Sequence, residues 1–73
     1  MDKSSEKEFL IIFGQNLRRL RKKRGFTQEE LANELDIEIS QISRIERGVI
    51  NTSVSLVKAI IDCLHIKADE LFD

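Results

Sequence analysis

The 73-residue sequence contains no proline, tryptophan or tyrosine, and it has only three glycines and one cysteine. Without proline, and with glycine only at positions 14, 25 and 48, long stretches are free to be helical. Cys63 has no partner for an internal disulfide, which is typical of a reducing compartment. The longest apolar run, FLIIF at residues 9–13, is far shorter than the ~20 residues of a membrane span. The polar start MDKSSEKE fits no secretory signal, so a cytoplasmic location and no membrane partner are expected.

The chain also lacks a large net charge. Its formal charge is −1 and its pI about 5.8, which argues against a protein that coats nucleic acid by bulk charge. The basic residues are nonetheless concentrated, because six of the seven positions from Arg18 to Arg24 (RRLRKKR) are Lys or Arg, and Arg44 and Arg47 follow. This basic patch, rather than the average charge, is what matters for binding nucleic acid.

The spacing of apolar residues predicts a chain of helices. Ser5 and Glu8 match a capping box for a first helix that runs to about Lys23. One face of this helix carries apolar residues at steps of four, four and three: Phe9, Phe13, Leu17 and Leu20. Further helices are expected at about residues 28–35, 38–47 and, after a cap at Ser53, 54–64, with a last helical turn at 68–72.

The segment from Thr27 to Gly48, TQEELANELDIEISQISRIERG, is the most informative part of the sequence. Thr27 and Glu30 match a capping box, a short break follows at Asp36, and Gly48 is the residue type that ends helices. Two short helices joined by so small a turn are typical of the helix-turn-helix unit, whose second helix enters the major groove. The pattern therefore predicts a DNA-binding protein.

The helix expected at residues 54–64 is apolar over most of its circumference, which indicates burial on most sides. A chain of this length buries only ~60% of its unfolded surface, so its own core covers only part of that helix. We therefore predict a homodimer through the C-terminal third, with an interface formed by Val57, Ile60, Ile61, Leu64, Leu71 and Phe72. The alternative is a monomer in which the last short helix covers the apolar excess.

The run FGQNLRRLRKKRGFTQEELANELDIEISQISRIERG, followed by the next helix and by ADELF, closely resembles the Cro/C1-type (Xre-like) helix-turn-helix family. The resemblance covers about residues 13–72. It implies an all-α, compact five-helix, lambda-repressor-like domain that binds palindromic operators as a homodimer. Residues 9–73 are expected to form this single domain, and residues 1–8 a polar tail or an extension of the first helix.

The resemblance also assigns roles to individual residues. Gln28, at the first turn of the second helix, is expected to hold a phosphate, as the unpaired N–H groups there also suggest; the alternative is a solvated side chain. Phosphate contacts are expected from Thr27, Gln28, Gln41, Arg47, Asn51 and Ser53. Base contacts are expected from the third helix: Glu38, Ile39, Ser40, Ser43 and Arg44.

Three of these residues can be interpreted further. The guanidinium of Arg44 fits the O6 and N7 of guanine. Ile39 either contacts a thymine methyl or closes the core at the start of the helix. Glu38 replaces the usual Ser or Thr cap, and it either accepts from a cytosine amino group or has no role in recognition. Asp36 is a second departure, since it occupies the turn position that usually carries glycine.

The resemblance further implies a buried salt bridge between Arg21 and Glu46, close to the DNA surface. The remaining basic side chains of the patch are expected to be part solvated surface and part steering charge: Arg18, Arg19, Lys22, Lys23 and Arg24.

An enzyme is not expected, because the sequence has no glycine-rich phosphate loop and no ligand set for a metal. His65 and Cys63 are expected to be buried, and no cofactor or small-molecule ligand is expected. The favoured function is a controller protein that times the expression of restriction-modification genes by binding double-stranded DNA. The alternatives are a phage-type repressor, or an antitoxin that acts as a protein-interaction module.

Overall fold

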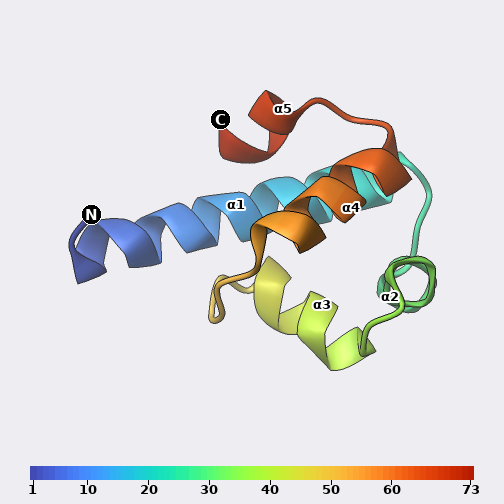
Figure 1. Cartoon of the computed structure of the whole chain (residues 1–73), viewed down its shortest axis with the longest axis horizontal. Helices are drawn as coiled ribbons and strands as arrows, with labels where there is room; N and C mark the ends of the chain where they lie inside the picture. Colours follow the sequence, from blue (N-terminus) through green and yellow to red (C-terminus); the bar gives the residue numbers. More distant parts are fainter.

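The computed structural model describes residues 1–73 and consists of five α-helices with no strand. They are α1 (Lys3–Lys23), α2 (Gln28–Leu35), α3 (Ile39–Glu46), α4 (Val54–Leu64) and α5 (Ala68–Phe72). The long α1 forms the spine, with α2 and α3 on one side of it and α5 on the other (Figure 1). None of the five helices combines the length and the hydropathy that a membrane-spanning segment needs. The predicted all-α, five-helix architecture is confirmed.

The starts of the helices are fixed by side-chain caps, one of them in an unexpected place. Asp2 caps α1 by accepting from the Ser5 N–H at 2.8 Å, so the predicted cap at Ser5 is wrong. This hydrogen bond holds the pKa of Asp2 below its ordinary value of 3.8. The Thr27–Glu30 capping box is present as predicted, with N–H to oxygen distances of 3.0 and 2.9 Å. Ser53 caps α4 by accepting from the Leu56 N–H at 3.1 Å.

Four helices end in the same way, with one residue in the left-handed conformation: Gly25, Asp36, Gly48 and His65. In each case the next N–H bonds the carbonyl five residues back, which satisfies an otherwise unpaired helix end. Asp36 (φ 57°) and His65 (φ 54°) adopt this conformation without being glycine, at a cost of roughly 1–2 kcal/mol each. The turn at Asp36 therefore forms despite the missing glycine.

The core draws apolar side chains from all five helices and from the α4–α5 link: Phe13, Leu17, Leu20, Leu31, Ala32, Ile42, Ile45, Ile60, Leu64, Ile66 and Leu71. Ile60, Leu64 and Leu71 are 0% exposed within the single chain. The prediction that these three contact a second subunit is therefore corrected, because their side chains already lie in the core of one chain, where α5 packs against α1. Val57 and Ile61 are only partly buried, and Phe72 is 42% exposed.

The approach of α3 to α1 depends on two glycines. A Cβ on Gly14 would lie 2.4 Å from the carbonyl oxygen of Ile45 and 2.6 Å from that of Glu46. A Cβ on Gly48 would lie 2.7 Å from the Cα of Ile11. Both neighbours are backbone atoms, which cannot move aside as a flexible side chain can. The C-terminal end of α3 is thus seated directly on α1.

Two polar side chains of the α1 segment hold the C-terminal half of the chain. The Arg24 guanidinium donates to the carbonyl oxygens of Leu64 and His65 at 2.8 and 3.2 Å, and Asn16 donates to that of Leu71 at 2.9 Å. Arg24 is therefore the C-terminal cap of α4 and not a free steering charge. His65 is exposed, so its predicted burial is wrong, and Cys63 is only half-buried.

Candidate nucleic-acid interface

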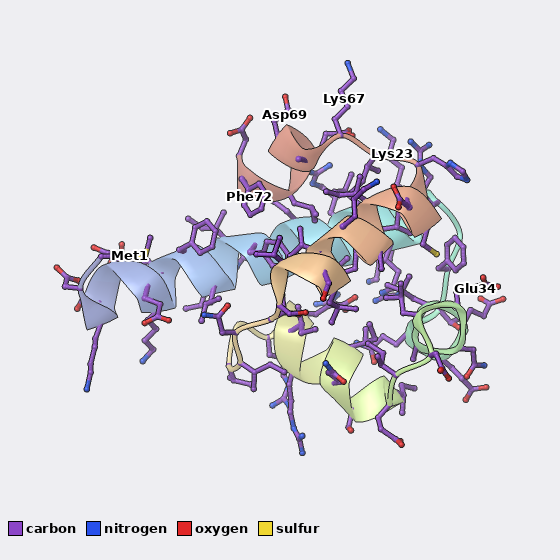
Figure 2. All side chains as sticks on the ribbon, viewed as in Figure 1. Met1, Lys23, Glu34, Lys67, Asp69 and Phe72 are labelled. Atoms are coloured by element: carbon purple, nitrogen blue, oxygen red, sulfur yellow. The ribbon has the colours of Figure 1, made fainter.

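The α3 helix lies at the edge of the molecule, and only one of its faces is buried. Ile42 and Ile45 are at most 1% exposed and seat the helix on the core. Side chains on its opposite side extend into solvent (Figure 2). The residues predicted to contact bases lie along this outer side: Glu38, Ile39, Ser40 and Arg44 are exposed, and Ser43 is half-buried, as is the neighbouring Gln41.

The structure decides between the two roles considered for Ile39. Its side chain is 47% exposed, so it does not close the core at the start of α3, and that alternative is wrong. Glu38, directly before it, occupies the N-cap position but makes no capping hydrogen bond. Its carboxylate also takes part in no salt bridge. The first turn of α3 thus presents one acidic and one aliphatic side chain to solvent.

An open polar depression of about 370 Å³ lies between α1, the start of α2 and the end of α3. No apolar residue lines it; its lining consists of Arg18, Arg21, Gln28, Ser43, Glu46 and Arg47. Three arginines against one glutamate make this depression electropositive. Arg18 and Arg47 are exposed and form no ion pair. Arg47 donates one long hydrogen bond, from Nε to the Ser43 carbonyl at 3.4 Å, so its terminal nitrogens and the Arg18 guanidinium are free to meet an anion.

The floor of the depression is the Arg21–Glu46 salt bridge that the resemblance implied. Its two parallel contacts measure 2.6 Å (Nε to Oε2) and 3.0 Å (Nη2 to Oε1). The two side chains are 7% and 3% exposed, and Arg21 also donates to the Phe26 carbonyl at 2.8 Å. This bidentate pair joins α1 to α3 and, through Phe26, to the segment that leads into α2.

Gln28 joins this pair as a third member. Its Nε2 donates to Glu46 Oε1 at 3.0 Å and its side chain is half-buried, so the alternative of a freely solvated residue is wrong. The backbone N–H groups of Gln28 and Glu29 have no acceptor within the chain, as is usual in the first turn of a helix. These donors, with the positive end of the α2 dipole, open beside the depression and suit an anion.

The hydroxyls of Thr27 and Ser53 are both engaged in caps. Each oxygen accepts a backbone N–H, while the hydroxyl proton of Thr27 remains available as a donor. Ser53 also shares a hydrogen bond with Ser55 at 3.1 Å. Asn51 is exposed, and its amide donates to Glu6 of α1 at 3.4 Å. Sequence reasoning treated Arg18 only as general surface, although its position three residues before Arg21 places both on one face of α1.

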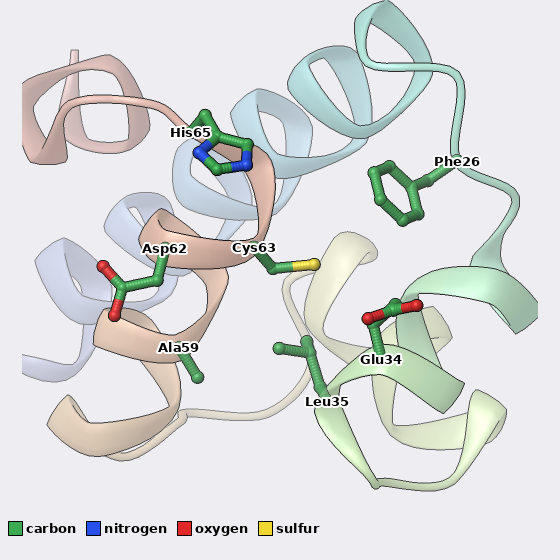
Figure 3. A pocket seen from close by; sticks show the side chains of 7 residues that line it. All are labelled: Phe26, Glu34, Leu35, Ala59, Asp62, Cys63 and His65. Carbon is green, nitrogen blue, oxygen red and sulfur yellow. The ribbon is translucent and has the colours of Figure 1, made fainter.

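A larger open depression, of about 670 Å³, lies between α2 and α4 (Figure 3). Its lining is mixed and includes Phe26, Glu34, Leu35, Asp62 and Cys63. Burial, and the nearby charge of Glu34, raise the pKa of the Cys63 thiol above its ordinary value of 9.0, which keeps the sulfur protonated at neutral pH. No group of three or more His, Cys, Asp or Glu side chains is placed to hold a metal ion.

A small helical domain with a tight turn between α2 and α3, and with the outer side of α3 free, defines a helix-turn-helix protein. Residues 17–71 match the helix-turn-helix (HTH_3) family model, and the chain belongs to this family of DNA-binding transcription regulators. The resemblance to Xre-like domains is thereby confirmed.

Two curated relatives are similar over most of their length. The uncharacterized HTH-type transcriptional regulator YazB of Bacillus subtilis (strain 168) is 42% identical over 60 residues, which cover 82% of this chain and 87% of the relative. Control protein C.BamHI of Bacillus amyloliquefaciens is 38% identical over 64 residues, which cover 86% and 79%.

Solved structures agree with this picture. The restriction-modification controller protein C.AhdI of Aeromonas hydrophila superposes with a TM-score of 0.81 at 38% identity, covering 86% of this chain and 96% of its own. The hypothetical transcription factor NHTF from Neisseria superposes with a TM-score of 0.83 at 26% identity, covering 93% and 78%. The relatives described here are transcription regulators or controller proteins and not enzymes.

Proposed function

We propose that this regulator binds a palindromic operator as a homodimer, with α3 of each subunit in the major groove. The observation that carries the proposal is the electropositive depression with its unpaired α2 N–H groups, which lies directly beside the free side of α3. A phosphate held in the depression fixes the register of the domain on the duplex, and the side chains of α3 then meet base edges.

The remaining polar residues extend the phosphate contacts on both sides. Gln28 and Arg47 line the depression, Thr27 directly precedes Gln28 in the chain, and Gln41 lies on α3. Asn51 and Ser53 lie in the loop between α3 and α4, and both are exposed. We add Arg18 to this set, because its unpaired guanidinium lines the same depression as Arg47.

The proposed subunit contact is the apolar surface between the first half of α1, the start of α4 and α5. Phe9 stacks on Phe72 with ring centroids 5.8 Å apart, and Val54 nearby is 87% exposed. A depression of about 180 Å³ runs between these side chains, with Phe13 and Val57 also in its lining. A second copy that covers this surface removes exposed aromatic and aliphatic area from water. Ile61 remains a half-buried candidate at the margin.

Among regulators of this family, we favour a controller protein that times the expression of restriction-modification genes. The support is the similarity to the control protein C.BamHI and to the controller protein C.AhdI, each at 38% identity. The phage-type repressor uses the same interface and differs only in the genes it controls.

The test is a titration of a fluorescent duplex carrying the upstream region of this gene, at several salt concentrations. We expect this duplex to be preferred over random DNA by ~10³-fold or more. With at least six phosphate contacts, affinity should fall by ~10³-fold or more between 50 and 200 mM salt. Arg47→Ala should weaken binding, whereas Lys58→Ala removes the same charge from the remote α4 helix and serves as the matched control. A flat response that is blind to sequence favours the antitoxin alternative.

A further inference from the structure

Ile39 is the one large apolar side chain exposed on α3. It is the first residue of the helix, and its neighbours on the outer side are Ser40, Ser43 and Arg44. In helix-turn-helix proteins the first turn of the second helix is the part that reaches base edges. An aliphatic side chain there has no hydrogen bond to offer, so its contribution to recognition is set by the apolar groups that DNA displays.

The major-groove edges of the four base pairs carry nitrogen and oxygen donors and acceptors and one apolar group, the methyl on C5 of a pyrimidine. We infer that Ile39 reads a pyrimidine C5-methyl group in the operator. This inference deepens the proposed function and rests on it. Two bases present such a methyl: thymine, and cytosine methylated at C5.

Glu38 narrows the choice of neighbouring base. Its side chain is exposed, forms no cap hydrogen bond and joins no salt bridge. A carboxylate only accepts hydrogen bonds, so it is repelled by the O6 and N7 acceptors of guanine, and it suits the amino group of cytosine better than that of adenine, which lies beside the N7 acceptor. Glu38 and Ile39 are consecutive, so the first turn of α3 is matched to a cytosine beside a thymine, or to one 5-methylcytosine that offers both groups.

The experiment begins with selection of preferred duplexes from a random pool by the wild-type protein. Each thymine in the selected site is then replaced by uracil, which removes only the methyl group. Loss of one buried methyl weakens binding about fourfold, and loss from both half-sites about 15-fold. As a control, a thymine outside the selected site is replaced by uracil, and this change should leave affinity unchanged.

Variants of Ile39 tie the effect to this side chain. Ile39→Ala should bind the thymine and uracil duplexes equally well, because the partner of the methyl is gone. Ile39→Val keeps a branched side chain and should keep most of the discrimination. Since Ile39 is exposed, neither variant removes core packing, and thermal unfolding should confirm that both remain folded.

A second set of duplexes identifies the source of the methyl. At the uracil-sensitive position the pair is changed to cytosine–guanine, with or without a methyl on C5, and methylation should strengthen binding about fourfold. If 5-methylcytosine binds more tightly than thymine, Glu38 and Ile39 read one base, and Glu38→Gln should remove that advantage. If thymine binds more tightly, the two side chains read successive bases.

The inference is overturned if wild-type protein binds thymine and uracil duplexes equally at every selected position. It is also overturned if Ile39→Ala weakens binding to the thymine and uracil duplexes by the same factor, because the preference for thymine would then not depend on Ile39. Selection that enriches no sequence at all gives a different result, because it overturns the proposed operator binding itself.

Discussion

The substitution Glu46→Ala tests how the recognition helix is held. It leaves the Arg21 guanidinium buried with only the Phe26 carbonyl as an acceptor, and it removes the acceptor of Gln28. Removing one partner of a buried ion pair typically costs ~3–5 kcal/mol. A 73-residue domain has a total stability of about 4–11 kcal/mol, so the loss is a large part of it.

Thermal unfolding followed by circular dichroism measures the effect. At ~4–8 °C per kcal/mol for a domain of this size, Tm should fall by at least about 12 °C. The matched control is Asp62→Ala, which breaks the Lys58–Asp62 pair. That pair has the same 2.6 Å separation, but its side chains are 70% and 60% exposed. An exposed helical pair contributes only ~0.3–0.5 kcal/mol, which limits its Tm shift to about 4 °C.

A double variant shows whether the stability lost in Glu46→Ala comes from the unpaired Arg21 charge or from lost packing. Arg21→Met with Glu46→Leu replaces the ion pair by apolar side chains and should recover most of the stability lost in Glu46→Ala. The reasoning is refuted if Glu46→Ala shifts Tm no more than Asp62→Ala does, because the pair would then contribute no more than a solvated one.

Four further predictions concern helix packing and the helix ends. Gly14→Ala should destabilise the fold by ~1–3 kcal/mol in urea unfolding, because the new methyl meets the α3 backbone; equal or greater stability would show that the two helices separate easily. His65→Gly should raise stability by ~1 kcal/mol, since glycine adopts the left-handed conformation without strain, and a lower Tm would contradict this. Arg24→Met should cost ~1 kcal/mol by uncapping α4 while weakening operator binding less than Arg47→Ala; the reverse order would show that Arg24 acts mainly on DNA, contrary to its capping role. The hydrogen bond from the Thr27 N–H holds the pKa of the Glu30 carboxyl in the folded protein below its ordinary value of 4.5. The stability that this bond contributes is therefore present above pH 4.5, and it is lost as the pH falls through the folded-state pKa. Glu30→Gln should flatten this part of the curve of Tm against pH, and an unchanged curve would contradict the prediction.

The regular part of the fold was predictable from the sequence because helix signals are local. The periodic apolar residues, the Thr27–Glu30 box and Gly48 all act within one or two turns, and the structure forms each of them. The predicted start of α1 was wrong for a related reason. Ser5 satisfies the same local rule, but Asp2, three residues earlier, satisfies it too, and its carboxylate accepts the hydrogen bond of the Ser5 N–H.

The errors at the C-terminal half arose from contacts between distant segments. Arg24 belongs to a basic run, and nothing local indicates that its side chain reaches the carbonyls of Leu64 and His65. The sequence shows that α4 is mostly apolar, but composition does not show that Ile60 and Leu64 lie wholly within the core of one chain. The Arg21–Glu46 bridge is also long-range, and it was predicted only because the family resemblance implied it.

The most direct test of the central claim is to map which residues respond when DNA is added. In an NMR titration of 15N-labelled protein with the upstream duplex, we expect the largest amide shifts at the start of α2 and along α3: Gln28, Glu29, Ile39, Ser40, Ser43 and Arg44. Residues around the α2–α4 depression, such as Asp62 and Cys63, should shift little. Shifts concentrated in that depression, with α3 unchanged, would contradict the assignment of α3 as the DNA-reading helix.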